Sequence, residues 1–236
     1  MPTESDFQRG YGVSRTTVRT ALGQLVTEGL VVTRKGYGSY VRARRPIRRV
    51  SSSHRHAAHR AGRKPVFDID VEAGDQVPSM RMLEVGRTEV PPEIAEWLQV
   101  ERGSSVVVRR RLQLVNDHPA VLSASYFPLW LAEGTRLGSS DALLEGPDEL
   151  IEGLGHRFVR GVEVFRARMP APEEARILRL DPGIPVVRML HVDYDAQGRT
   201  LQVADDLYAG DQHEFAFEWS EAETGDGGAQ RAEPRA

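Results

Sequence analysis

The feature that most limits how this chain can fold is a unit that occurs twice, 80 positions apart. The first copy, PPEIAEWLQVERGSSVVVRR, begins at Pro91, and the second, APEEARILRLDPGIPVVRML, begins at Ala171. Each copy predicts a helix that opens with proline and acidic residues, then a glycine turn and a valine-rich strand. A polar turn and a return strand follow each copy, at residues 120–127 and 201–208. Two such halves can share one antiparallel sheet, so the sequence predicts an α+β domain with a ligand-sized cleft between pseudo-symmetric halves.

A second constraint lies near the start of the chain, in residues 13–41. Ser14 suits the N-cap of a helix, because its hydroxyl can accept a hydrogen bond from a backbone N–H one turn later. Val18, Leu22 and Leu25 then recur at the spacing of one buried helical stripe. The stretch therefore predicts an amphipathic helix.

The other face of this helix is basic, because Arg15 and Arg19 lie four positions apart. Gly29 stands where helices commonly end in the left-handed conformation. Short strands are predicted at residues 31–34 and 39–41, joined by a glycine-containing turn. A helix with one apolar and one Arg/Thr face, followed by a wing, favours a helix-turn-helix that enters a major groove. The alternative interpretation is an ordinary surface helix with solvated arginines.

The residues before this helix predict the first helix of the pair. Thr3 can act as its N-cap, and Glu4 and Asp6 lie near the positive end of the helix dipole. Phe7 and Tyr11 are four positions apart and are expected to pack on the next helix.

The formal net charge of −3 conceals a strong asymmetry between the two ends. Residues 1–65 carry 14 Lys and Arg against 3 Asp and Glu, a balance of +11, whereas residues 66–236 carry 17 against 31, a balance of −14. Such an asymmetry indicates a polyanionic partner for the basic part.

Several classes of protein are disfavoured by composition. Cysteine is absent, which excludes disulfides, thiolate catalysis and cysteine-ligated zinc. No apolar run approaches the roughly 18 residues of a membrane helix, and no leader is evident, so we expect a cytoplasmic protein without membrane contact.

The pattern predicts four segments along the chain. Residues 1–43 form the winged helix-turn-helix, residues 44–66 a basic linker, residues 67–219 the α+β domain, and residues 220–236 an acidic, glycine-rich disordered tail. The linker histidines have no carboxylate or thiolate nearby, so we expect no metal site and no cofactor.

Within the α+β domain the first predicted element is a strand. Residues 67–72 alternate apolar and acidic side chains, which predicts an edge strand with one solvated face. Residues 80–85 are its expected partner.

The chain resembles a known family in two separate sets of blocks. PTESDF, VSRTTVRTAL, LVTEGLVV and KGYGSYV resemble, in this order, the winged-helix domain of the GntR family of transcription regulators. RRRLQLVNDHP, SASYFP, YDAQGRTLQ and LYAGDQHEF resemble the UTRA effector domain of its HutC subfamily, which has a chorismate-lyase-like fold. The resemblance implies a ligand-responsive repressor that binds a near-palindromic double-stranded operator as a homodimer and responds to a small-molecule effector.

The resemblance also implies which residues contact DNA. Arg15 and Arg19 would reach phosphates or base edges, and Gly36 would let the tip of the wing approach the minor groove. The full set of implied DNA contacts is Thr3, Ser14, Arg15, Thr16, Thr17, Arg19, Lys35, Gly36, Tyr37 and Gly38.

Two departures from the family pattern affect this part of the chain. Ser5 stands where the family often has a basic residue. The family's first helix normally precedes the block that begins at Pro2, so the expectation is either a winged helix that lacks this helix or a start assigned too late.

The effector site is implied in the same way. The family's strand before the first hairpin turn often carries Arg-x-Arg, a fork for anionic groups, and the matching residues here are Arg111 and Gln113. Strand alternation places both on one face, and the change of one cation to an amide favours an effector less anionic than a sugar phosphate. The alternative is that Arg111 is simply one of three surface arginines, residues 109–111. The implied effector-binding residues are Arg111, Gln113, Ser123, Gln202 and Tyr208.

Two rival functions remain open. The resembled fold also serves chorismate lyase, but His118, His156 and His213 fall in predicted turns or loops, and only His191 lies in a strand. No nucleophile triad, metal-ligand spacing or phosphate-binding glycine loop is present, so we expect no enzyme. The other rival is a ligand-binding or dimerising protein that has lost DNA binding together with its first helix.

Overall fold

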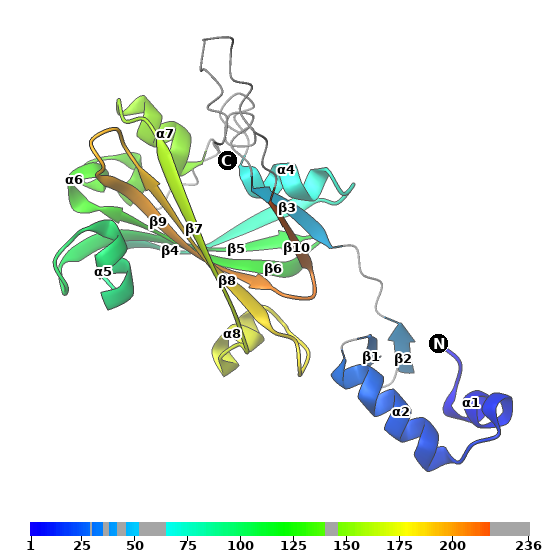
Figure 1. Ribbon diagram of the computed structural model, residues 1–236. Coiled ribbons are helices and arrows are strands. Elements are labelled where there is room, and N and C mark those ends of the chain that lie inside the picture. The colour runs from blue at the N-terminus through cyan, green and yellow to red at the C-terminus, as the bar shows by residue number, and fades with distance from the viewer. Residues whose placement is uncertain (29, 35–37, 42–45, 52–64, 140–145, 218–236) are drawn as a thin grey trace, which may run out of the picture.

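The computed structural model describes residues 1–28, 30–34, 38–41, 46–51, 65–139 and 146–217. A small helical N-terminal part with a hairpin is followed by a larger sheet domain (Figure 1). None of the helices in the described ranges is long and apolar enough to cross a membrane.

The N-terminal part contains the two predicted helices and the predicted wing. The hydroxyl of Thr3 accepts a hydrogen bond from the backbone N–H of Asp6, and Ser14 accepts one from Thr17, each at 3.2 Å, so both predicted N-caps are confirmed. Val18 is only 5% exposed, and Leu22 and Leu25 are half-buried, which confirms the apolar stripe. Gly29 lies outside the described residues. The elements are α1 (Glu4–Tyr11), α2 (Arg15–Thr27), β1 (Val31–Arg34) and β2 (Gly38–Val41).

The sheet domain has one six-stranded sheet in the order β4-β5-β6-β9-β8-β7, with every neighbouring pair antiparallel. Each copy of the sequence repeat supplies one helix and one hairpin, and β6 and β9 meet at the centre, so the predicted shared sheet is confirmed. The repeat helices are α5 (Pro92–Leu98) and α8 (Pro172–Ile177). The strands are β4 (Pro78–Glu89), β5 (Ser105–Val115), β6 (His118–Pro128), β7 (Arg160–Arg168), β8 (Val186–Tyr194) and β9 (Thr200–Ala209).

The two faces of this sheet are covered differently. On one face α5 and α8 bury two separate apolar clusters, one with α5 against β5, β6, β8 and β9, the other with Leu178, just after α8, against β5, β8 and β9. In Figure 1 these helices lie below the sheet, and α4 and α7 lie above it. The elements on the second face are β3 (Ile47–Ser51), α4 (Val66–Glu72), α6 (Leu129–Ala132), the short helix η1 (Arg136–Gly138), α7 (Pro147–Gly153) and β10 (His213–Phe217).

Cover on this second face is concentrated at its two ends. Residues of α6, η1 and α7 form an apolar cluster with Val107 and Phe127 at one end. At the other end Val71 of α4 and Ile47 of β3 pack with Val121 and Tyr208. The middle of the face therefore stays polar between two apolar anchors.

Two expectations for this region were wrong. The predicted edge strand at residues 67–72 is part of helix α4, because Phe67 and Val71 are also four positions apart and bury one helical face in the apolar cluster around β3. Within the predicted linker, Ile47–Ser51 instead form β3, which pairs in parallel with β10 and buries Ile47. The partner strand lies far away in the sequence, so local composition could not reveal this pairing. Residues 80–85, the expected partner of the strand at 67–72, do lie in a strand, but this strand is β4 and it pairs with β5.

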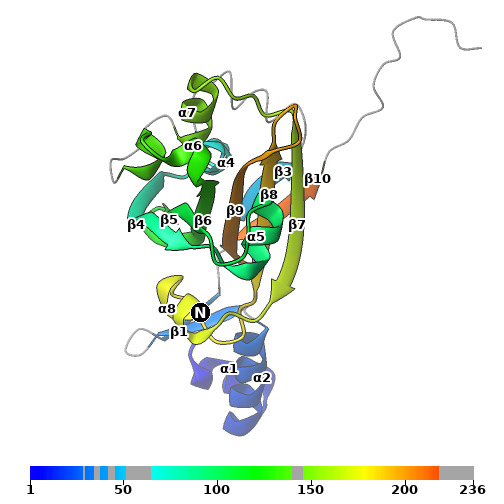
Figure 2. The same ribbon diagram turned by 90° about the vertical axis from the view of Figure 1, so that its left-hand side faces the viewer.

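The N-terminal part contacts the sheet domain at the turn before β8. Gly183 has a φ of +85°, and a Cβ there would lie 3.2 Å from the carbonyl oxygen of Thr27 at the end of α2. Figure 2 shows α8 and the N-terminal part on the same side of the sheet domain. This glycine therefore combines a left-handed backbone with a close approach between the two parts.

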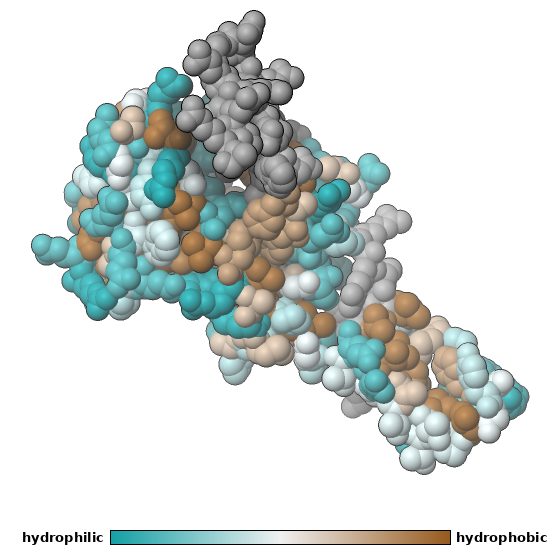
Figure 3. Space-filling model, in the orientation of Figure 1, coloured by the Kyte–Doolittle hydropathy of each residue, from teal (hydrophilic) through white to brown (hydrophobic). Residues whose placement is uncertain are grey.

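Apolar side chains are exposed along the β7 edge of the sheet. Val164, Met169 and Phe217 have 38%, 57% and 61% of their surface exposed. Figure 3 shows apolar residues over β7 and β10 on the face turned toward the viewer. Among the described residues no strand pairs with the outer edge of β7, so this edge combines free strand backbone with apolar surface.

A close backbone approach at Gly210 generates a test of the fold. A Cβ at Gly210 would lie 2.6 Å from the carbonyl oxygen of Pro185, the oxygen to which Gly210 also donates its N–H at 3.0 Å. We expect Gly210→Ala to lower the free energy of unfolding by about 1–3 kcal/mol, because the backbone at the start of β8 must shift. Urea unfolding followed by tryptophan fluorescence reports on this domain, since Trp97, Trp130 and Trp219 all follow residue 65.

The matched control for this prediction is Gly86→Ala in β4, where a Cβ would meet nothing within 4 Å. Equal unfolding midpoints for the two variants would contradict the proposed crowding at Gly210.

Candidate effector pocket and DNA-binding helix

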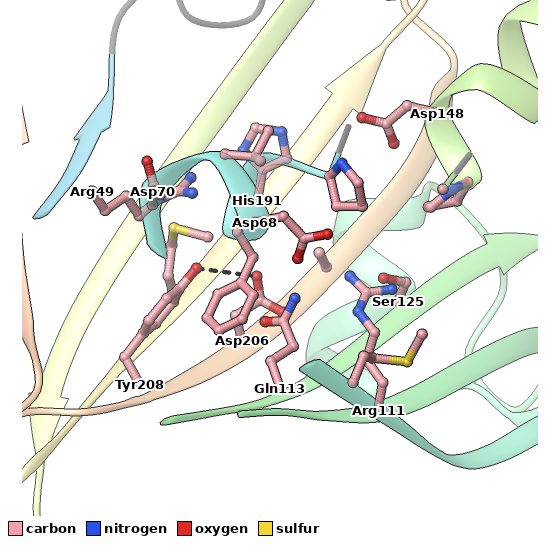
Figure 4. Close-up of a pocket in the computed structure, with 18 of the residues that line it drawn as sticks. Arg49, Asp68, Asp70, Arg111, Gln113, Ser125, Asp148, His191, Asp206 and Tyr208 are labelled. Atoms are coloured by element: carbon pink, nitrogen blue, oxygen red, sulfur yellow. Dashed lines mark hydrogen bonds between the residues drawn. The ribbon is translucent and has the colours of Figure 1, made fainter. Parts of the chain in front are cut away.

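A cavity of about 320 Å³ opens over the polar middle of the second sheet face. Its floor comes from alternate residues of β5, β6, β8 and β9, and its walls come from α4, β3 and the start of α7 (Figure 4). Register explains the polar floor: Arg111 pairs across the sheet with Ser123, and Ser123 pairs with Asp206, so one row of the sheet carries three polar side chains.

Four of the five residues predicted to bind an effector line this cavity. They are Arg111 and Gln113 on β5 and Gln202 and Tyr208 on β9. Arg111 and Gln113 share a face, as strand alternation predicted. Ser123 does not line the cavity; it is buried and donates its hydroxyl hydrogen bond to Asp206, which does.

The three consecutive arginines of β5 have three different environments. Arg109 is 1% exposed and its Nη1 donates to the carbonyl oxygens of Ser139 and Leu137 at 2.7 and 3.1 Å. Arg110 points to the opposite face and pairs with Glu84 at 2.6 Å. Arg111 is half-buried in the cavity and has no hydrogen-bond or ion-pair partner in the described ranges. The alternative of three equivalent surface arginines is therefore wrong, and Arg111 offers an uncommitted positive charge.

A buried ionic cluster closes another side of the cavity. His191 lies between two carboxylates, with Nδ1 3.2 Å from Glu163 and Nε2 3.0 Å from Asp193. Burial alone would lower the pKa of His191, but Asp193 and Glu163 outweigh it and raise this pKa to about 10. The imidazole is therefore an imidazolium at neutral pH. Glu163 also pairs with Arg49, which reaches the cavity from β3.

Tyr208 and Asp206 form a second polar group on the floor. Burial raises the pKa of Tyr208, and the charge of Asp206 raises it further, so the phenol keeps its proton. It donates to Asp206 over a long 3.4 Å, drawn as a dashed line in Figure 4. Nearby His213 donates from Nδ1 to the carbonyl oxygen of Ala209 at 3.0 Å, and burial lowers its pKa to about 4.

Sequence reasoning missed most of the polar lining, for two reasons. Arg109, Ser125 and Asp206 follow the same alternation as the predicted residues, so the strand pattern could have found them. Arg49 and Asp148 come from elements that fold onto the sheet from elsewhere, and no local signal marks them. Among the described residues no group of three or more His, Asp or Glu side chains could hold a metal ion, and the histidines of the predicted linker lie outside those residues.

The basic face of α2 is exposed and ordered by one carboxylate. Glu4 of α1 accepts from Nε of Arg15 at 3.0 Å and from Nε of Arg19 at 3.2 Å, and these arginine side chains remain 65% and 60% exposed. The two hydrogen bonds lower the pKa of Glu4, which keeps it ionised. Among the described residues, the terminal nitrogens of both arginines have no hydrogen-bond partner, so they can bind a ligand.

The other residues predicted to contact DNA have mixed placements. The hydroxyls of Thr3, Ser14 and Thr17 make cap hydrogen bonds, so they shape the two helix starts. Thr16 is exposed beside them, and Gly38 opens β2 with a φ of +90°. Lys35, Gly36 and Tyr37 lie outside the described residues.

These features together define a class of protein: a transcription regulator with an exposed basic recognition helix and a separate domain built around a small-molecule pocket. Residues 1–41 match the bacterial regulatory proteins of the gntR family, and residues 73–214 match the UTRA domain. The chain belongs to the GntR family, in the branch that carries a UTRA effector domain, as the HutC-like architecture predicted.

Relatives and solved structures agree with this assignment. The chain is 26% identical to the HTH-type transcriptional repressor NagR of Bacillus subtilis, covering 91% of this chain and 83% of that protein. It is also 26% identical to the HTH-type transcriptional regulator GgaR of Escherichia coli, covering 92% of this chain and 81% of that one. The crystal structure of PhnF from Mycobacterium smegmatis has the same fold, with a TM-score of 0.62, 22% identity and coverage of 93% and 91%. Regulators of this family bind DNA, and the relatives named here are transcription regulators.

The buried imidazolium predicts how stability depends on pH. Because the pKa of His191 is raised from 6.5 to about 10, its contribution is complete below pH 6.5 and is lost as the pH rises toward 10. We expect His191→Gln to lower the free energy of unfolding by on the order of 1–3 kcal/mol at pH 7, and the difference from the unmodified protein to shrink by pH 10. Urea unfolding at several pH values measures this difference.

His118→Gln is the control, since His118 is exposed at the start of β6, where its Nδ1 lies 2.9 Å from the carbonyl oxygen of Asn116. A His191→Gln deficit that stays constant from pH 7 to pH 10 would show that His191 is not a buried cation.

Proposed function

We propose that this protein is a cytoplasmic repressor that leaves its operator when a small metabolite fills the cavity of the UTRA domain. The observation that carries the proposal is the position of Arg49. It lies on β3, which follows the wing strand β2 after residues 42–46, and its side chain reaches the cavity. One strand thus leads from the DNA-binding part directly into the wall of the ligand site.

The coupling would act through the contacts that hold β3 in place. β3 pairs only with β10 in the described ranges, and Arg49 pairs with Glu163 on β7. A ligand that attracts either member of this ion pair favours one placement of β3 over another. A coupling free energy of about 1–3 kcal/mol is enough for a 5–150-fold change in DNA affinity.

On the DNA side, we propose that a homodimer places two copies of α2 on the half-sites of a near-palindromic operator, about one helical turn apart. Arg15 and Arg19 would reach base edges or phosphates with their free terminal nitrogens. Glu4 would hold both side chains toward the groove, because it binds Nε of each. The cap geometry at Ser14 supports this by fixing where α2 begins.

Substitution of the two arginines tests the DNA-binding role of α2. Arg15→Ala and Arg19→Ala should each weaken binding to the operator by about 1–3 kcal/mol if the side chain reads a base. Fluorescence anisotropy with DNA from the region upstream of the protein's own gene measures the affinity.

The control is Arg102→Ala, an equally exposed arginine that pairs with Glu96 on the sheet domain. If both α2 variants bind the operator as tightly as this control, the recognition surface lies elsewhere. If the unmodified protein does not bind the DNA at all, a ligand-binding protein without DNA binding becomes the better description.

Arg111 provides the test of the ligand response. We expect Arg111→Ala to require on the order of tenfold more of any anionic metabolite that releases DNA from the unmodified protein, because the uncommitted guanidinium is lost. Release is measured by gel shift over a concentration series of candidate metabolites, with the metabolite-free lanes as the reference for DNA affinity. A normal response of Arg111→Ala would place the effector site outside this cavity.

A further inference from the structure

Gln202, on the β9 part of the cavity floor, has an unusual set of hydrogen-bond partners. It is 5% exposed, and its Nε2 donates to Asp193 at 2.8 Å and to Asp148 at 3.1 Å. Carboxylate oxygens only accept hydrogen bonds, so the amide cannot turn around without placing its oxygen against two anions. The orientation of the side chain is therefore fixed by its neighbours.

The fixed orientation leaves an acceptor without a donor. Oε1 of Gln202 is buried and has no hydrogen-bond partner in the described part of the chain. A buried polar atom without a partner costs about 1–3 kcal/mol, which water or a ligand that donates can recover. Gln202 lines the cavity, so a ligand bound there is the nearest possible source of such a donor. Nε2 of His213 is a second buried acceptor without a partner, and it lines the same cavity.

The groups around this end are predominantly acidic. Asp148, Glu163 and Asp206 line the cavity, and Asp193 accepts a hydrogen bond from Gln202. In the described ranges Arg49 pairs with Glu163, and His191 lies between Glu163 and Asp193. Asp148 lies beside the amide of Gln202, and a carboxylate there favours a positively charged donor over a neutral one.

On β5 the cavity offers a positive charge instead, which favours an anionic group of the ligand. Arg111 has a positive charge and no partner in the described ranges, and Gln113 follows it on the same face. Figure 4 shows Asp148 and Arg111 on the same side of the cavity, above and below its middle. A ligand that satisfies both would carry an anion at one end and N–H donors at the other.

We propose that the effector is a small zwitterion, with an ammonium group bound by Gln202 and Asp148 and an anionic group bound by Arg111. An ammonium supplies three N–H donors and a positive charge, which matches the acceptor excess at Gln202. Amino acids and aminoalkyl phosphates share this chemistry, and the nature of the anion separates them. This inference rests on the proposed function, in which the cavity is the effector site.

The test uses pairs of compounds that differ only in the donor group. Isothermal titration calorimetry on the full chain at pH 7 compares amino acids with hydroxy acids, and aminoalkyl phosphates with hydroxyalkyl phosphates, over a series of chain lengths. We expect the ammonium member of a binding pair to bind on the order of tenfold more tightly, the equivalent of ~1.4 kcal/mol. Equal or tighter binding of the hydroxyl member, or no binding by any pair, would overturn the proposal.

The variant Asp148→Asn removes one negative charge beside Gln202 and keeps the side-chain shape. The preference for the ammonium member should fall several-fold, because the ammonium loses an ionic partner that the hydroxyl never needed. Glu133→Gln is the control, an exposed carboxylate that pairs with Arg87 outside the cavity. An undiminished preference in Asp148→Asn would refute the assigned position of the ammonium, and thermal unfolding of both variants checks that each is folded.

The same samples separate this inference from the proposed function. If the ammonium compounds bind preferentially but leave DNA affinity unchanged in anisotropy, the zwitterion site stands and the repressor mechanism fails. If a compound without an ammonium group releases the DNA while its ammonium partner does not, the mechanism stands and the zwitterion assignment fails.

Discussion

The pairing of β6 with β9 is the constraint on which the ligand site depends. It joins the two copies of the repeat in one sheet, with Val121 opposite Tyr208 at one end and Tyr126 opposite Val203 at the other. The side chains of a strand alternate between faces, so a slip of one residue would move the polar row to the side of α5 and α8. The register thus decides that the polar side chains of both halves face the same cavity.

Charge is tolerated in this cavity because most of it is paired. Arg109 is bound by backbone carbonyl oxygens, His191 lies between two carboxylates, and Arg49 pairs with Glu163. Buried charges without such partners would cost several kcal/mol each. Two groups have no hydrogen-bond or ion-pair partner among the described residues, Arg111 and Oε1 of Gln202, and these two are therefore informative. They say more about the chemistry of a ligand that fits this cavity than the cavity volume does.

Different contacts hold the N-terminal part together and connect it to the cavity. Glu4 joins α1 to both arginines of α2, so the recognition surface is held by local contacts within the N-terminal part. In the proposed mechanism the link to the cavity runs through β3. This strand pairs with β10, and its residue Ile47 packs in the apolar cluster of the sheet domain. In the proposed mechanism a shift of β3 would displace the N-terminal part as a whole rather than unfold it locally.

The sequence by itself determined the elements with local signals: the caps at Thr3 and Ser14, the two-faced helix α2, the repeat, and the face shared by Arg111 and Gln113. Each of these depends on residues within a few positions of one another, or on a period that can be read along the chain. Only the tertiary structure decided that residues 67–72 are helical and that Ile47–Ser51 form a strand. The alternating stretch at residues 67–72 also has apolar residues four positions apart, so it fits both the strand period and the helix period until a neighbouring surface selects one. The strand β3 needs a partner, and this partner lies near the other end of the chain. For the same reason Arg49 and Asp148 entered the cavity without any local sign, because long-range packing alone brought them there.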